Sequence, residues 1–204
     1  MTSSAPEAAV SRLLPLPASG TWDWEAVFGR RAPVILEVGS GKGVFLAAAA
    51  RACPQRDFFG VEIRRRRVEK IAARLLPFPN ARVAEGDVRV VLGAAPPGSL
   101  SACWVNFPDP WPKHRHAGRC IFTPSFAADV SRALAPGAEL VASTDLAWYA
   151  AEILLACMDC PDLENPWGPA RPAPRPEGYP VSIHEEKFRA WGRPVYFLRF
   201  RRRG

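Results

Sequence analysis

A glycine-rich turn directly after an apolar run is the first place where residue types and spacing could do chemistry. Residues 36–43 read L-E-V-G-S-G-K-G, and glycine lets a backbone take positive φ angles and approach a ligand closely. A phosphate-binding P-loop needs G-x-x-x-x-G-K-[ST], but Leu36 and Gly43 stand at its first glycine and its hydroxyl. A dinucleotide fingerprint needs glycine at position 44, which is Val44. The turn therefore fits neither phosphate-binding motif.

Carboxylates placed around this turn favour a different ligand, S-adenosylmethionine (SAM). The spacing E-x-G-x-G-x-G starts at Glu37 and includes Gly39 and Gly41. A carboxylate there would repel a pyrophosphate but tolerates the cationic methionine end of SAM. Glu62 ends the next apolar run, at the position where an acid accepts both ribose hydroxyls of an adenosine. Asp87 follows a third run and is predicted beside the adenine, although Gly-Asp after a strand is also a common turn. The alternative is an ordinary glycine turn flanked by surface acids.

A second candidate site is a loop in which two prolines enclose an aspartate. Residues 106–116 read N-F-P-D-P-W-P-K-H-R-H, and the prolines fix the backbone around Asp109 before a ligand binds. The aromatic residues offer stacking surfaces, and Lys113 offers a cation for phosphate. His114 and His116 lack nearby acids or cysteines, so we predict no metal site. The loop is therefore predicted to contact nucleic acid.

An alternation of apolar runs and helix-like segments positions both candidate sites. Strands are predicted at 34–38, 57–63, 81–84, 100–105 and 139–143, and helices at 42–52, 64–76, 123–134 and 148–158. This order predicts βαβ units, and hence an α/β fold with a mainly parallel sheet and helices on both faces. A last strand at 194–201 follows a long loop without a crossover helix, so it is predicted to pair antiparallel. Ligands bind beyond the carboxyl ends of such strands, which is where Glu37, Glu62 and Asp109 fall.

Length and composition predict how the chain is divided. Its 204 residues suit one domain of ordinary size. Residues 1–20 are rich in Ser, Ala and Pro and are predicted to be a flexible lead-in. Residues 21–204 are predicted to form a single domain. Within it, the proline-rich stretch 161–180 is predicted to be a loop without regular structure, and 181–204 a C-terminal segment on the substrate side.

Net charge indicates the kind of partner. The chain has 27 Lys+Arg against 20 Asp+Glu, a net charge of +7, and only four of the cations are lysine. Arginine binds phosphate in a bidentate fork, so the excess favours a polyanionic partner such as nucleic acid, with a composition bias as the alternative. The runs Arg64–Arg67 and Arg201–Arg203 are predicted to contact RNA phosphates, and the first fits a solvated helix face equally well.

Cysteine usage and hydropathy predict a cytoplasmic protein. The five cysteines are odd in number and lack framework spacing, which fits a reducing compartment. Cys157 and Cys160 form a lone C-x-x-C late in a helix-like segment, where neither a redox pair nor a zinc site is expected. No apolar run approaches the ~20 residues that span a bilayer, and the start of the chain lacks a signal pattern. We expect no membrane association, no obligate protein partner, and a monomer or homodimer.

The motifs together resemble one family. The turn at 37–43, G-V-E-I at 60–63, N-F-P-D-P-W-P-K at 106–113 and S-T-D at 143–145 are similar, in that order, to bacterial tRNA (guanine-N7-)-methyltransferases, over roughly residues 21–204. The resemblance implies a Rossmann-like class I methyltransferase fold that transfers a methyl group from SAM to N7 of guanine in the variable loop of tRNA. It implies SAM contacts by Glu37, Glu62, Asp87 and Asp109, a catalytic role for Asp109, and substrate contacts by Lys113 and Asp145.

Two segments depart from the family pattern. The family tends to carry R-H-x-K-R-R after the aspartate loop, whereas residues 115–120 read R-H-A-G-R-C. The T-K-F-E of the family, near the C-terminus, corresponds to E-K-F-R at 186–189. The resemblance implies substrate contacts by the residues of this segment, Glu186, Lys187, Phe188 and Arg189. Both departures concern contacts to tRNA and leave the SAM-binding motifs intact.

The chemistry implied at Asp109 is alignment of the substrate. Guanine N7 carries an in-plane lone pair and no proton, so attack on a sulfonium methyl group needs orientation more than a base. Asp109 can accept hydrogen bonds from the N1–H and the exocyclic amine of guanine, and adenine lacks these donors on that edge. Two other functions stay open: a SAM-dependent methyltransferase acting on another nucleic-acid nitrogen, and a tRNA-binding protein with a vestigial SAM pocket.

Overall fold

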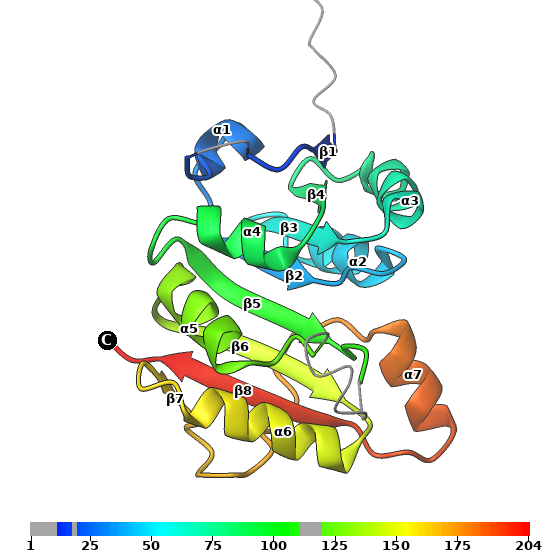
Figure 1. Ribbon diagram of the computed structural model, residues 1–204. Helices are drawn as coiled ribbons and strands as arrows, with labels where there is room; N and C mark the ends of the chain where they lie inside the picture. Colours follow the sequence, from blue (N-terminus) through cyan, green and yellow to red (C-terminus); the bar gives the residue numbers. More distant parts are fainter. Residues whose placement is uncertain (1–11, 18–19, 111–119) are drawn as a thin grey trace, which may run out of the picture.

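One eight-stranded sheet organises the chain (Figure 1). The computed structural model describes residues 12–17, 20–110 and 120–204. The strands are β1 (Leu13–Leu14), β2 (Val34–Val38), β3 (Asp57–Glu62), β4 (Ala81–Glu85), β5 (Leu100–Asn106), β6 (Leu134–Thr144), β7 (Leu163–Glu164) and β8 (Tyr196–Arg202). The helices are α1 (Trp24–Phe28), α2 (Val44–Ala52), α3 (Arg65–Leu75), α4 (Val88–Ala94), α5 (Pro124–Ala133), α6 (Ala147–Met158) and α7 (Ile183–Ala190).

The sheet is mainly parallel, as the sequence predicts. Its strand order is β1-β4-β3-β2-β5-β6-β8-β7. The pairs from β1 through β6 are parallel, whereas β8 pairs antiparallel with both β6 and β7. The predicted antiparallel C-terminal strand is thus confirmed. Because β8 runs against β6, its end lies beside the start of β6, with Arg201 opposite Glu139 and Tyr196 opposite Thr144.

Helices bury both faces of the sheet, which explains why β2 and β3 are buried along their whole length. One core cluster contains residues of α1, α4, α5 and α6, including Leu92, Phe126 and Ile153. The other contains residues of α2 and α3, including Leu46 and Ile71. The core therefore consists of two layers separated by the sheet. No helix in the described residues is long and apolar enough to cross a membrane.

The proline-rich stretch completes the second layer. The ring of Tyr179 lies 4.9 Å from the rings of both Phe45 and Trp104, and 6.1 Å from that of Phe197. Its side chain is nearly inaccessible, with 6% exposure. The stretch thus covers β5 and β8 on the face of the sheet that also carries α2.

Short strands occur in two segments, 1–20 and 161–180, for which the sequence predicts no regular structure. Leu13–Leu14, within the predicted flexible lead-in, pairs in parallel with β4, and the backbone N–H of Val83 donates to the carbonyl of Arg12 over 2.8 Å. The expectation of a flexible lead-in therefore does not hold for Leu13–Leu14, which form a strand. The proline-rich stretch contains β7 and a bridge from Ala173 to Phe197. Both expectations failed because strands this short have no hydrophobic period of their own and depend on their neighbours.

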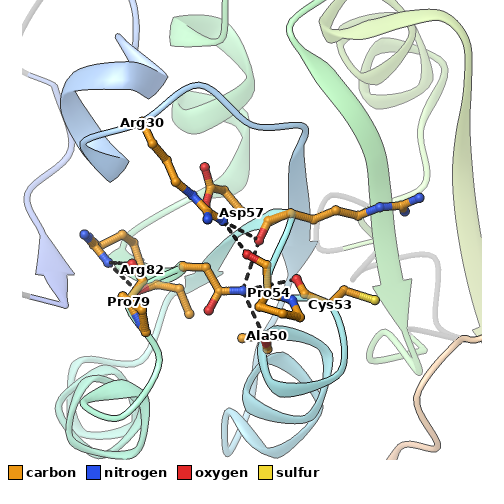
Figure 2. A network of polar contacts seen from close by, with 10 residues as sticks. Arg30, Ala50, Cys53, Pro54, Asp57, Pro79 and Arg82 are labelled. Atoms are coloured by element: carbon orange, nitrogen blue, oxygen red, sulfur yellow. Dashed lines mark hydrogen bonds and ion pairs between the residues drawn. The ribbon is translucent and has the colours of Figure 1, made fainter.

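A polar network holds the amino end of β3 (Figure 2). The guanidinium of Arg30 donates two hydrogen bonds, of 2.9 and 2.7 Å, to the buried carboxylate of Asp57. The side-chain amide of Asn80 donates to the carbonyls of Ala50, Cys53 and Arg56. The Asn80 bonds connect the loop between α2 and β3 to the loop that precedes β4. The network lies at the edge of the sheet opposite the glycine turn, and its role is structural.

Candidate cofactor and substrate site

The glycine turn joins the end of β2 to the start of α2. Gly39, Gly41 and Gly43 have φ angles of +71°, +57° and +68°, which favour glycine strongly. The backbone N–H of Gly39 donates to the carbonyl of Val61 over 2.8 Å, which ties the turn to β3. A Cβ atom on Gly43 would lie 2.8 Å from Cγ2 of Ile71 in α3. The turn therefore needs glycine both for its backbone angles and for the close packing of α3.

The Glu37 side chain lies beneath this turn in an environment that opposes its charge. It is the fourth of the five residues of β2 and is 3% exposed. Burial, assisted by the nearby charge of Glu62, raises the pKa of its carboxyl to about 7. Within the described residues, its Oε2 atom has no hydrogen-bond partner. A buried carboxyl oxygen without a partner is an available acceptor for a ligand that brings donors or positive charge.

Glu62 at the end of β3 holds the turn from the other side. Its Oε2 accepts from the backbone N–H of Gly41 over 3.0 Å, and its Oε1 accepts from that of Arg64 over 3.1 Å. The guanidinium of Arg67 lies 3.7 Å from Oε2. The structure thus brings the predicted cofactor residues Glu37, Gly39, Gly41 and Glu62 together at the carboxyl edge of neighbouring strands.

Asp87 lies in the loop after β4, at the same edge, and caps α4. Its carboxylate accepts the backbone N–H of Arg89 over 2.9 Å and forms a two-pronged ion pair with the Arg89 guanidinium, at distances of 2.6 to 3.0 Å. These hydrogen bonds lower the pKa of Asp87. The backbone N–H of Gly86 donates to the carbonyl of Glu62 over 3.1 Å, which joins this loop to β3. Asp87 is therefore close to the predicted cofactor site but shares its carboxylate with Arg89.

Asp109 is exposed in the loop that leaves β5. Just before it, Asn106 ends the strand, and its Oδ1 accepts hydrogen bonds of 3.0 Å from the hydroxyls of both Ser143 and Tyr179. Phe107 has a φ angle of +48°, which is strained for a residue with a side chain. The start of the loop is therefore fixed by β6 and by the proline-rich stretch. The predicted substrate residue Lys113, like His114 and His116, lies outside the described residues.

Asp145, directly after β6, is held by an arginine from the segment that follows α7. Its Oδ2 lies 2.7 Å from the Arg193 guanidinium, and its side chain is 11% exposed. α7 stands beside the carboxyl ends of β5 and β6 (Figure 1). Of the α7 residues predicted to contact substrate, Lys187 and Phe188 contact aromatic rings, Arg189 pairs with Glu185, and Glu186 is exposed.

Two residues of α7 that the sequence did not single out contribute to the candidate site: His184 lies beside the Asp109 loop, and Glu185 anchors the helix. The His184 ring lies 5.6 Å from that of Phe107. Burial and the charges of Lys187 and Lys42 lower the pKa of His184, whereas Asp109 and Asp145 oppose this shift. His184 is therefore a partly exposed neighbour of the Asp109 loop, with its ring beside that of Phe107. A lone histidine in a charged helix has no pattern that would have revealed this.

Glu185 anchors α7. Its carboxylate is 2% exposed and accepts hydrogen bonds from Arg175 over 2.8 Å and from Arg189 over 3.1 Å. Ser182 caps the helix by accepting the backbone N–H of Glu185. The Arg175 pair connects α7 to the proline-rich stretch, and through Tyr179 to Asn106. The Ser182 cap has the S-x-x-E spacing of a helix start, and Glu185 and Arg189 are four residues apart on one helix, so both contacts follow local spacings. The Arg175 contact joins separate segments, and no local spacing indicates it.

The C-terminal arginines lie far from this site. Arg199 and Arg201 pair with Glu139 at 2.7 and 3.4 Å, and Arg203 pairs with Glu164 at 3.3 Å. Since β8 is antiparallel, these residues lie at the amino edge of the sheet, opposite the glycine turn. These arginines therefore do not belong to this site, and their contact with RNA phosphates stays a prediction.

Metal and thiol chemistry find no support in this arrangement. Within residues 12–17, 20–110 and 120–204, no group of three His, Cys, Asp or Glu side chains could hold a metal ion. The five cysteines are free, and burial raises the pKa of the Cys157 thiol well above its ordinary value. A buried neutral thiol is a poor nucleophile.

A mainly parallel sheet, a glycine turn after β2, and acids at the ends of β2 and β3 define the class I methyltransferase fold. Among solved structures, the 16S rRNA methyltransferase KamB matches with a TM-score of 0.63 at 18% identity, over 91% of this chain and 96% of that chain. A SAM-dependent O-methyltransferase from Thermotoga maritima matches with a TM-score of 0.55 at 15% identity, over 86% and 61%. These similarities support the fold alone.

Sequence comparison gives the family. A family model described as "Putative methyltransferase" matches residues 31–198. The tRNA (guanine-N(7)-)-methyltransferase of Alkalilimnicola ehrlichii is 40% identical over 92% of this chain and 80% of its own length. That of Geobacter metallireducens is 35% identical over 88% and 87%. The chain belongs to the tRNA (guanine-N(7)-)-methyltransferase family.

Proposed function

We propose that this protein transfers a methyl group from SAM to N7 of a guanine in tRNA. The observation that carries the proposal is the position of Asp109. It lies exposed after β5, and β5 pairs directly with β2, the strand that bears Glu37. The names of the related proteins supply the substrate class, tRNA, and the target atom.

The residues at the carboxyl edge fit the methyl donor. The unpartnered buried oxygen of Glu37 suits the cationic methionine end. Glu62, whose Oε2 accepts from the N–H of Gly41, would accept the two ribose hydroxyls as well, and the Gly39–Gly41 turn would let the backbone approach the ligand closely. Asp87 would lie at the adenine, sharing its carboxylate with Arg89. Bound SAM would supply an electrophilic methyl group on a positively charged sulfur.

Asp109 would orient the guanine. Its carboxylate accepts the N1–H and the exocyclic amine, which places the N7 lone pair without removing a proton. The same carboxylate stabilises the positive charge that develops on the purine. Adenine would leave Asp109 without donors, so the contact also discriminates between purines.

Substrate contacts outside the reacting base would come from both sides of Asp109. Lys113 would bind backbone phosphate from the loop itself, and Lys187 would do so from α7. Asp145 forms an ion pair with Arg193. In the proposed complex Arg193 would bind a phosphate of the RNA, and Asp145 would accept a hydrogen bond from it. In this arrangement α7 and the Asp109 loop form the two walls of the substrate site.

The test is methylation of unmodified tRNA with labelled SAM, followed by reductive aniline cleavage, which cuts at N7-methylguanosine. We expect one cleavage site per methylated tRNA. Asp109→Ala should lower kcat/KM by about 100-fold, because it removes a preorganised charge beside the reacting base. Asp159→Ala, at an exposed aspartate that ends α6, is the matched control and should keep full activity. Label incorporated without cleavage would show that another nitrogen is methylated. SAM and tRNA binding without transfer would indicate a vestigial site.

A further inference from the structure

The segment that ends α7 carries an exposed indole on a rigid turn. Trp191 is 61% exposed, although it follows a helix directly. Its backbone N–H donates to the carbonyls of Lys187 and Phe188, and that of Arg193 donates to Phe188 over 2.9 Å. Gly192, at a φ of +68°, makes this reversal possible. The backbone that carries the indole is therefore fixed, so that only the side chain of Trp191 has to be ordered when a ligand binds.

The Trp191 indole ends a row of aromatic rings that begins at the Asp109 loop. The centroids of Phe107 and Phe188 are 5.5 Å apart, and those of Phe188 and Trp191 are 6.0 Å apart. Phe107 is separated from Asp109 by a single proline. The row thus leads from the predicted position of the target guanine outward to solvent.

Cations accompany the rings along this row. The Nζ atom of Lys187 lies 4.4 Å from the centroid of the Trp191 ring. The guanidinium of Arg193 lies 5.0 Å from the centroid of Phe188, and its ion pair with Asp145 fixes the turn to the end of β6. Exposed rings combined with cations are the means by which proteins bind unpaired nucleic-acid strands, since the rings stack on bases and the cations bind phosphates.

We propose that Trp191 and Lys187 form a stacking site for one unpaired base of the tRNA, adjacent to the target guanine. The proposal rests on the proposed tRNA substrate and adds a second point of contact to it. Phe107 and Phe188 lie between Trp191 and Asp109, so the base on Trp191 is a neighbour of the target and not the target itself. The positive charges beside the rings favour RNA over an apolar protein segment as the occupant.

The test compares Trp191→Ala, Trp191→Phe and, as a control, Leu155→Ala, which truncates a side chain with 64% exposure on α6. Filter binding measures the Kd for unmodified tRNA, calorimetry the Kd for SAM, and thermal melting the fold. We expect Trp191→Ala to weaken tRNA binding about tenfold, and Trp191→Phe to retain most of it because a ring remains. Leu155→Ala should change nothing, and SAM binding should be the same in all variants. Quenching of tryptophan fluorescence by tRNA should decrease in Trp191→Phe.

Several results would overturn the stacking site. Wild-type tRNA affinity in Trp191→Ala would do so, and would leave a protein partner as the better occupant. Equal losses in the Ala and Phe variants, or a parallel loss of SAM binding and thermal stability, would do so as well. Failure of the proposed function looks different: the wild-type protein would then transfer no methyl group, while tRNA binding would still depend on Trp191.

Discussion

At the scale of single residues, the buried carboxyl of Glu37 stands out because its ionisation destabilises the folded protein, whereas we propose that its charge favours SAM binding. Its pKa is about 7 in the folded chain, against an ordinary 4.5. Between these values the folded state binds more protons than the unfolded state, so stability falls as pH rises from about 4.5 to about 7. Above that range the folded protein carries the full cost of ionising a buried acid.

Glu37→Gln should therefore stabilise the protein at pH 8. We expect an increase in the free energy of unfolding on the order of 3 kcal/mol, measured by urea unfolding. The gain should vanish near pH 4.5, where the wild-type carboxyl is neutral in the folded state and its ionisation no longer opposes folding. The same variant should bind SAM more weakly by calorimetry, since the cationic ligand loses its counter-charge. An equal gain at both pH values would show that burial of charge is not the cause.

Residue positions at the cofactor site could be predicted because strand ends are visible in the sequence. Glu37, Glu62 and the glycines follow apolar runs, and parallel strands bring such positions to one edge. The contacts that these side chains make with other residues of the chain could not be predicted in the same way. Arg89 pairs with the Asp87 carboxylate, and the His184 ring lies beside Phe107 only because α7 packs against the Asp109 loop.

At the scale of elements, a buried ion pair is one of the contacts that hold α7 in its orientation. Glu185 is 2% exposed, and its partner Arg175 comes from the proline-rich stretch. This stretch also supplies Tyr179, whose hydroxyl reaches Asn106 before the Asp109 loop. The stretch thus couples the two walls of the proposed substrate site.

Arg175→Met should destabilise the protein by about 2–3 kcal/mol, because it leaves a buried carboxylate with Arg189 alone. It should also raise the KM for tRNA with little effect on the Kd for SAM, since α7 loses its anchor while the glycine turn does not. The double variant Arg175→Met/Glu185→Leu removes the stranded charge and should regain most of the stability in urea unfolding. If the single and double variants are equally unstable, the ion pair is not the anchor.

Helices and strands could be predicted where they are long enough for buried residues to recur at a regular spacing. α3 shows buried Val68, Ile71 and Leu75 at helical spacing. By contrast, α4 reads V-R-V-V-L-G-A, in which β-branched residues disfavour a helix, and the cap at Asp87 and burial against the sheet override that preference. The two-residue strands β1 and β7 lie below any periodic signal.

At the scale of the whole molecule, the basic charge is divided between the two edges of the sheet. Arg64 and Arg66 are exposed at the start of α3, on the edge that carries the site. Arg201 and Arg203 pair with acids at the opposite edge. The sequence predicts that the last strand is antiparallel, and this direction is sufficient to place Arg201 and Arg203 at the amino edge. Net charge by itself does not say at which edge the arginines lie.

Arg64→Gln/Arg66→Gln should weaken tRNA binding and lower the slope of log Kd against log salt by about 2, because each removed arginine leaves one phosphate without its cation. Arg201→Gln/Arg203→Gln removes the same charge from the other edge and should leave both affinity and slope unchanged. Filter binding over a range of salt concentrations measures both. Equal effects of the two pairs would mean that the RNA also covers the amino edge.

The strands at the two borders of the sheet have a consequence for self-association. β1 and β7 are two residues long, while the strands they cover, β4 and β8, have five and seven residues. A border this short offers few free backbone groups on which a second chain could add a strand. The two short strands β1 and β7 therefore reduce edge-to-edge aggregation. Removing β1 would uncover the backbone of Val83 and Ala84 in β4, and removing β7 would uncover that of Arg201 and Arg202 in β8.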